Sequence, residues 1–194
     1  MLVMDGIKEF EFNEHGLQKL KELPKGTNWP VVYLIHDEKN LYIGETTSAA
    51  ARMSQHLKNE EKKNLQVIEI VFDGRFNKSV ILDYEQRLIK YCSVDGKFQN
   101  ILNKNRGQQA IHDYYQRKFY RNQFTVLWQE MLDKKLANNS LEIIYVFLTI
   151  FLYLPKCPQS LILSALRAFC FCGKPRISRS IFLYFPCQSW LKSW

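Results

Sequence analysis

Apolar positions divide the first part of the chain into short, alternating elements. Alternation over residues 7–12 predicts a strand, and three leucines at helical spacing predict a helix from residue 13 or 14 to residue 23. Two β-rich runs, 31–35 and 41–45, are separated by five polar residues. This arrangement predicts a β-hairpin.

The pattern continues with helices on both sides of one more strand. A helix capped by Thr47 or Ser48 is predicted to run to about residue 58, and a strand is predicted over 66–72. A second helix follows a cap at Asn77 or Ser79. The stretch 95–109 is predicted to be a loop, and 113–136 a last helix.

The hairpin has a consequence for two tyrosines. If His36 pairs with Leu41, then Tyr42 lies opposite Ile35, which shares a sheet face with Tyr33. Both phenol rings are then expected on one face. A one-residue bulge would break this inference.

Composition changes abruptly after residue 139. Residues 140–194 contain six lysines and arginines but only one carboxylate, Glu142, so they carry much of the net charge of +8. The apolar run 143–154 is shorter than the roughly 17–25 residues of a membrane span. We interpret this tail as a non-native or disordered segment, typical of a shifted reading frame. A membrane anchor and a native functional tail are the alternatives.

Cysteine usage and the first residues bear on location. Four of the five cysteines lie in the tail, without a Cys-x-x-Cys pair, so zinc is not expected. The first twelve residues contain three carboxylates and no long apolar core, so they do not resemble a secretory signal. A cytoplasmic, reducing location is expected. The basic balance suits nucleic acid as a partner, and also a membrane surface.

Several residues of the hairpin and its flanking helices suit phosphodiester hydrolysis. This reaction needs an activated water, a Lewis acid and positive charge near the phosphate. Arg52 and His56 lie one helical turn apart, and Glu85 is a carboxylate of the type that binds Mg²⁺. Each residue taken alone is more often an ordinary surface or core residue.

Together these residues resemble the GIY-YIG nuclease superfamily. The first motif is matched by Val31-Val32-Tyr33, which retains only the tyrosine, and the second in full by Tyr42-Ile43-Gly44. The resemblance implies an α/β (α+β) fold with a small three-stranded antiparallel sheet flanked by helices. With the patterns above, it divides the chain into an N-terminal extension over 1–28, a nuclease domain over 29–110, a C-terminal helix over 111–139 and the tail over 140–194.

The resemblance further implies a role for each site residue. Tyr33 would be the general base, Tyr42 would orient water or phosphate, and Arg52 would stabilise the phosphate. His56 would support Tyr33 or the phosphate, and Glu85 would ligate one Mg²⁺ or Mn²⁺. Asn103, with Asn100 as the alternative, would fix the architecture of the site. Gly44 and Thr46 are the remaining motif residues.

The expected function is therefore that of a metal-dependent endonuclease acting on nucleic acid, with DNA the expected substrate. Basic side chains expected to contact phosphates are Lys62, Lys63, Arg75, Lys78, Lys104 and Arg106. Similar modules are fused to uncharacterised P-loop ATPase domains, but no P-loop motif is present here. A nucleic-acid-binding module without turnover, or a membrane-associated protein acting through 143–154, are the competing hypotheses.

Overall fold

The computed structural model describes residues 5–104 and 116–153. The strands in these ranges are β1 (Gly6–Glu11), β2 (Val31–His36), β3 (Asn40–Thr46), β4 (Val67–Phe72) and β5 (Asn100–Ile101). The helices are α1 (Glu14–Glu22), α2 (Ala49–Leu57), α3 (Lys78–Asp95), α4 (Arg117–Asp133) and α5 (Leu141–Tyr153).

The strands form one sheet in the order β1-β4-β2-β3-β5. Neighbours are antiparallel except β3 and β5, which run parallel. The mixed α/β class is confirmed, but the three-stranded sheet was wrong. The predicted strands β4, β2 and β3 form its centre, β1 adds to β4, and the two-residue β5 adds to β3. Pairings between segments this far apart in the sequence leave no local pattern.

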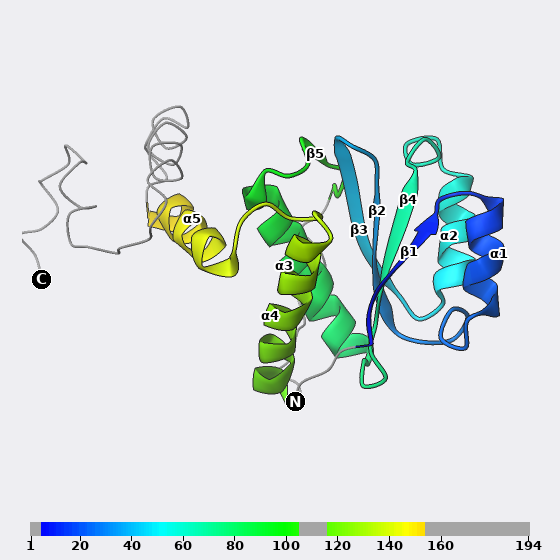
Figure 1. Ribbon diagram of the computed structural model, residues 1–194, viewed down its shortest axis with the longest axis horizontal. Coiled ribbons are helices and arrows are strands. Elements are labelled where there is room, and N and C mark those ends of the chain that lie inside the picture. Colours follow the sequence, from blue (N-terminus) through cyan, green and yellow to red (C-terminus); the bar gives the residue numbers. More distant parts are fainter. Residues whose placement is uncertain (1–4, 105–115, 154–194) are drawn as a thin grey trace, which may run out of the picture. The chain divides into compact units, whose positions relative to one another are not determined.

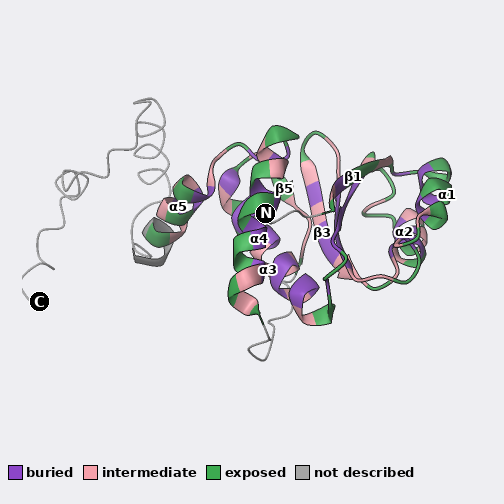
Figure 2. Ribbon diagram, turned by 60° about the horizontal axis from the view of Figure 1, so that its bottom comes forward, coloured by how far each residue is buried: buried purple, intermediate pink, exposed green. Residues whose placement is uncertain are grey.

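Helices cover both faces of the sheet, as Figure 1 shows, with α1 and α2 on one side and α3 and α4 on the other. Each face has its own core. Tyr33, Ile35 and Met53 belong to the core under α1 and α2, which we call the α1/α2 face. Leu34 and Trp128 belong to the larger core on the opposite side, which we call the α3/α4 face. In Figure 2 buried segments, coloured purple, occur in the sheet and in helices α3 and α4.

Side-chain caps determine where two helices begin. The Asn13 and Asn77 side chains accept hydrogen bonds from Gly16 N and Val80 N, at the starts of α1 and α3. At the end of α3, Gly96 adopts a left-handed conformation with φ of 72°, which a residue without Cβ adopts readily. The predicted cap at Asn77 is thus confirmed, and it fixes the start of the helix that carries Glu85.

The hairpin has the predicted register. Ile35 lies opposite Tyr42, and Tyr33 lies opposite Gly44. The β2–β3 ladder runs unbroken from Val31 to His36, so no bulge intervenes. Both tyrosines consequently project from the α1/α2 face.

The last described helices complete the α3/α4 face. Trp128 of α4 is almost fully buried and its Nε1 donates a hydrogen bond to the Asn139 carbonyl at 3.0 Å. Leu141 and Ile144, from the start of α5, belong to the same core. Residue 113, the predicted start of the last helix, lies outside the described residues. None of the helices in the described ranges is long and apolar enough to cross a membrane.

Candidate active site

Three aromatic rings converge on the α1/α2 face. The Tyr33 hydroxyl oxygen lies 2.8 Å from Nε2 of His56, and both side chains are buried. The Tyr42 ring lies 5.1 Å from the His56 ring and 6.2 Å from the Tyr33 ring, measured between centroids. Strand β2, strand β3 and helix α2 therefore each contribute one ring to a compact cluster.

Gly44 makes room for this cluster. Tyr33 lies across the Gly44 backbone, and a Cβ at that position would meet the Tyr33 hydroxyl oxygen at 2.3 Å. Real Cβ atoms do not approach other atoms so closely. Gly44, the glycine of the second motif, is thus required by the packing of the Tyr33 ring from the neighbouring strand.

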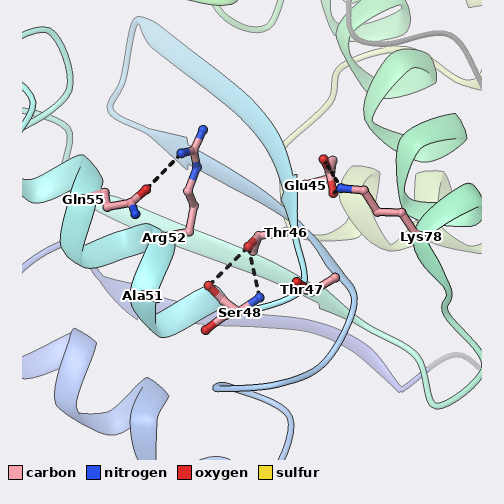
Figure 3. Close-up of a pocket in the computed structure, with 8 residues that line it drawn as sticks. All are labelled: Glu45, Thr46, Thr47, Ser48, Ala51, Arg52, Gln55 and Lys78. Carbon is pink, nitrogen blue, oxygen red and sulfur yellow. Dashed lines mark hydrogen bonds and ion pairs between the residues drawn. The ribbon is translucent and has the colours of Figure 1, made fainter.

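Arg52 connects the cluster to an open cavity. Its Nε donates to the Tyr33 hydroxyl oxygen at 3.3 Å, and its Nη1 donates to Gln55 Oε1 at 3.0 Å. In Figure 3 Arg52 and Gln55 extend from α2 on one side of the cavity, and Lys78 and Glu45 lie on the other. The cavity has a volume of about 330 Å³. The Tyr33 oxygen thus lies next to a cation that reaches the surface.

Lys62 also belongs to the cluster. Its Nζ lies 3.3 Å above the centre of the Tyr42 ring and 3.3 Å from Nδ1 of His56. Burial lowers the pKa of Lys62 to about 8, with a contribution from the charge of Arg52. The sequence indicated only a phosphate contact for this lysine, because its spacing gives no sign that the chain folds back after α2.

Burial dominates the titration behaviour of the two central groups. It raises the pKa of Tyr33, and the neighbouring Tyr42 adds to this while Arg52 opposes it. Burial lowers the pKa of His56 to about 3, assisted by the charges of Lys62 and Arg52. His56 is therefore neutral near pH 7 and has a single ring proton to donate.

Glu85 lies on α3, close enough to Glu45 of β3 and to Arg52 for their charges to act on its carboxyl. Burial raises the pKa of this carboxyl to about 7, and the negative charge of Glu45 is the next contribution. The Glu45 carboxylate in turn accepts hydrogen bonds from Lys78 Nζ at 2.5 Å. Glu45, which sequence reasoning missed, is thus a second carboxylate beside Glu85. Its position two residues beyond Ile43 on the same strand face could have indicated this.

Asn103 and Thr46, two further predicted residues, bond the backbone of β3 and of the turn that follows it. Asn103 Nδ2 donates to the Ile43 carbonyl at 2.7 Å, and Ile43 N donates back to Asn103 Oδ1 at 3.0 Å. This side chain continues the edge pairing that β5 begins. Thr46 Oγ1 accepts from Ser48 N at 3.0 Å and so shapes the turn into α2. Asn100 instead bonds Asn40, farther along the strand.

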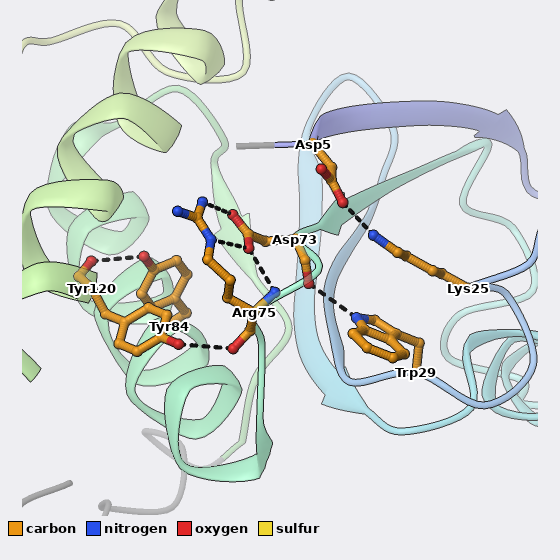
Figure 4. A network of polar contacts seen from close by, with 7 residues as sticks. All are labelled: Asp5, Lys25, Trp29, Asp73, Arg75, Tyr84 and Tyr120. Atoms are coloured by element: carbon orange, nitrogen blue, oxygen red, sulfur yellow. Dashed lines mark hydrogen bonds and ion pairs between the residues drawn. The ribbon is translucent and has the colours of Figure 1, made fainter. Parts of the chain in front are cut away.

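The remaining basic candidates are dispersed. Lys63 and Lys104 are exposed and pair with Glu60 and Glu61, at 2.5 and 2.7 Å. Arg75 contacts the buried Asp73 carboxylate, within the network that Figure 4 shows. In that network Trp29 Nε1 donates a hydrogen bond to the Asp73 carbonyl. The Tyr120 hydroxyl donates to the Arg75 carbonyl, which joins α4 to the segment after β4. Arg106 lies outside the described residues.

The fold and the cluster define a small α/β protein with a tyrosine–histidine–arginine centre. Residues 30–93 match the family model for the GIY-YIG catalytic domain, a segment that includes every clustered residue. The chain thus carries a domain of the GIY-YIG nuclease superfamily. Comparison with curated proteins and with solved structures gave no significant match.

The donor set at Glu85 fits a divalent cation. Within the ranges that the structure describes, no three His, Cys, Asp or Glu side chains converge as a closed metal cage. Mg²⁺ is commonly held by one or two carboxylates together with waters and substrate phosphates, so a closed cage is not required. Burial and then the charge of Glu45 raise the pKa of Glu85, and two neighbouring carboxylates of this kind are suited to a cation.

Proposed function

We propose that this protein is a metal-dependent endonuclease that hydrolyses phosphodiester bonds, with DNA as the expected substrate. One observation carries the proposal most: the Tyr33 oxygen lies within hydrogen-bond distance of both His56 and Arg52, and Arg52 lines an open cavity. Arg52 Nε donates to this oxygen, which favours its negatively charged form. The GIY-YIG match places the domain in a nuclease family, which supports the same chemistry.

Tyr33 is proposed as the general base. Its phenolate oxygen takes a proton from the attacking water, and the water oxygen forms the new bond to phosphorus as the bond to the leaving oxygen breaks. The leaving oxygen then acquires a proton from solvent. Because burial raises the pKa of Tyr33, only a fraction of the protein has the phenolate near neutral pH, and Arg52 increases that fraction.

Arg52 is proposed to bind the scissile phosphate. Its guanidinium is half-buried, lines the cavity and already lies against the Tyr33 oxygen. A fixed cation at this place stabilises the negative charge that the phosphate oxygens gain in the transition state. Contact with Gln55 restricts the side chain before substrate arrives, which reduces the cost of orienting it.

Glu85 is proposed to hold one Mg²⁺ or Mn²⁺, with Glu45 as a neighbouring ligand. When bound, the ion would supply Lewis-acid stabilisation of the phosphate and of the leaving oxygen. Lys78 forms an ion pair with Glu45 in the free protein. It therefore partly neutralises the carboxylates that the ion would use.

A plasmid-nicking assay with the full chain tests this proposal. Cleavage is expected with Mg²⁺ or Mn²⁺ and is expected to stop with a chelator. Arg52→Ala and Glu85→Gln should each lower the rate by roughly a hundredfold or more. Glu22→Gln, which changes an exposed carboxylate of α1, is the matched control and should cut like the parent.

The assay also separates the competing function. Parent-like cutting by both Arg52→Ala and Glu85→Gln would overturn the site assignment. Salt-sensitive DNA binding without cleavage under either metal would instead identify a binding module.

A further inference from the structure

Lys62 is held in place beside the active-site cluster by the turn that follows α2. Its backbone N donates to the Asn59 carbonyl at 3.0 Å, and its carbonyl accepts from Leu65 N at 3.0 Å. Its side chain is half-buried over the Tyr42 ring, whereas that of Lys63, the next residue, is exposed. The backbone of this turn therefore directs one of two adjacent lysines toward His56.

The contact between Lys62 and His56 restricts the histidine proton. A lysine ammonium has only donors, so at 3.3 Å it requires a lone pair on Nδ1 of His56. A neutral imidazole with a lone pair on Nδ1 carries its proton on Nε2. Nε2 lies 2.8 Å from the Tyr33 hydroxyl oxygen, so this proton is donated to that oxygen.

The alternative tautomer would have the opposite effect on Tyr33. With its proton on Nδ1, His56 would present a lone pair to Tyr33 and accept the phenol proton. The phenol form would then be favoured, and the oxygen would lose the imidazole as a donor while keeping Arg52 Nε at 3.3 Å. The Nε2–H tautomer instead gives the oxygen two donors, as a phenolate requires.

We propose that Lys62 is a positioning residue, which fixes the Nε2–H tautomer of His56 and thereby stabilises the Tyr33 phenolate. The low pKa of His56, about 3, agrees with this because it keeps the ring neutral. The effect of Lys62 on rate depends on the proposed nuclease function. Its effect on the tautomer does not.

Nitrogen-15 NMR of the full chain tests the tautomer directly, because ring nitrogens with and without a proton have distinct shifts and couplings. His56→Gln assigns the signal among the four histidines. The parent is expected to show the Nε2–H form near pH 7. In Lys62→Met, which keeps the apolar stem over Tyr42, the Nδ1–H form should appear. Lys62→Arg retains a donor-only cation and should preserve the parent form.

Cleavage rates of the same proteins provide the second readout. Lys62→Met should lower the rate about tenfold to a hundredfold, the range typical of a partner that orients a site residue. Lys62→Arg should recover most of that loss. Lys58→Met, an exposed lysine at the end of α2, is the matched control and should change neither tautomer nor rate.

The two readouts separate this inference from the proposed function. An Nδ1–H form in the parent, or an unchanged Nε2–H form in Lys62→Met, overturns the role of Lys62 even when the protein cuts DNA. A tautomer that depends on Lys62 in a protein without cleavage supports the positioning role and refutes the nuclease proposal.

Discussion

The two faces of the sheet each contain a completely buried tyrosine, but the two hydroxyl groups are used differently. Tyr84, on the α3/α4 face, donates its proton to the Tyr120 carbonyl at 2.7 Å. Tyr33, on the α1/α2 face, has an oxygen that contacts an imidazole and a guanidinium instead. A backbone acceptor keeps a phenol protonated, whereas nitrogen donors favour its deprotonation. Burial alone therefore does not distinguish a structural tyrosine from one proposed to be catalytic.

The charged side chains on the two faces also have different partners. On the α3/α4 face, Arg87 lies 3.0 Å from the buried Asp83 carboxylate, four residues earlier on α3. On the α1/α2 face, the cations Arg52 and Lys62 surround neutral rings. An excess of positive charge next to an open cavity is suited to an anionic substrate, whereas a paired charge in a core is suited to packing.

The pH dependence of cleavage tests whether the Tyr33 oxygen acts as the base. Because the pKa of Tyr33 is raised, the phenolate fraction should increase about tenfold for each pH unit below that pKa. At saturating Mg²⁺ the cleavage rate should therefore rise about tenfold between roughly pH 7 and pH 8. The rise should be smaller above about pH 8, where Lys62 loses its charge. A flat profile would indicate a base that is already deprotonated, such as His56.

Gly44→Ala should reduce cleavage by about a hundredfold, because the new Cβ must displace the Tyr33 ring and a shift of 1 Å can have this effect. Gly74→Ala is a matched control, since its Cβ would meet the flexible end of Lys25 at 3.3 Å and the Asp5 carboxylate at 3.9 Å. Circular dichroism would establish that both variants fold. Equal activity in the two would show that the Tyr33 position does not limit the reaction.

Tyr84→Phe tests the structural tyrosine. It removes a buried hydrogen bond to the Tyr120 carbonyl and should lower the free energy of unfolding by about 1 to 3 kcal/mol. The cleavage rate of the folded protein should stay near that of the parent. Denaturant titration and the nicking assay measure the two effects separately. A large loss of rate at normal stability would make the Tyr84 hydroxyl part of the chemistry.

Glu69→Gln should give the smallest effect, on stability alone. Burial raises the pKa of this carboxyl to about 7, and Lys134 opposes the shift. A raised pKa means that the folded state binds the proton more tightly than the unfolded chain. The stability that the folded state gains from a protonated Glu69 is therefore complete below about pH 4.5 and is lost as pH rises through about 7. Glutamine does not titrate, so the variant does not lose this stability as pH rises. Its melting temperature relative to the parent should therefore increase from pH 5 to pH 8. A difference that does not change with pH would contradict the assignment.

The sequence predicted the local parts of this arrangement well. The hairpin register follows from the period-two alternation of strands, and the Asn77 cap follows from the chemistry of helix starts. Contacts between distant segments could not be predicted in this way. The pairing of β1 with β4 depends on tertiary packing, as does the return of Lys62 over Tyr42. Arg75, expected to contact nucleic acid, instead pairs with Asp73 two residues earlier, a local contact that the residue types alone did not indicate.

The nicking rate of Tyr33→Phe tests the central claim most directly. This substitution removes one oxygen and leaves the ring over Gly44, so the fold should be retained. The account predicts a rate about 10²- to 10⁴-fold below that of the parent with Mg²⁺, the usual contribution of a general base. A folded Tyr33→Phe protein that nicks plasmid at the parent rate would contradict it.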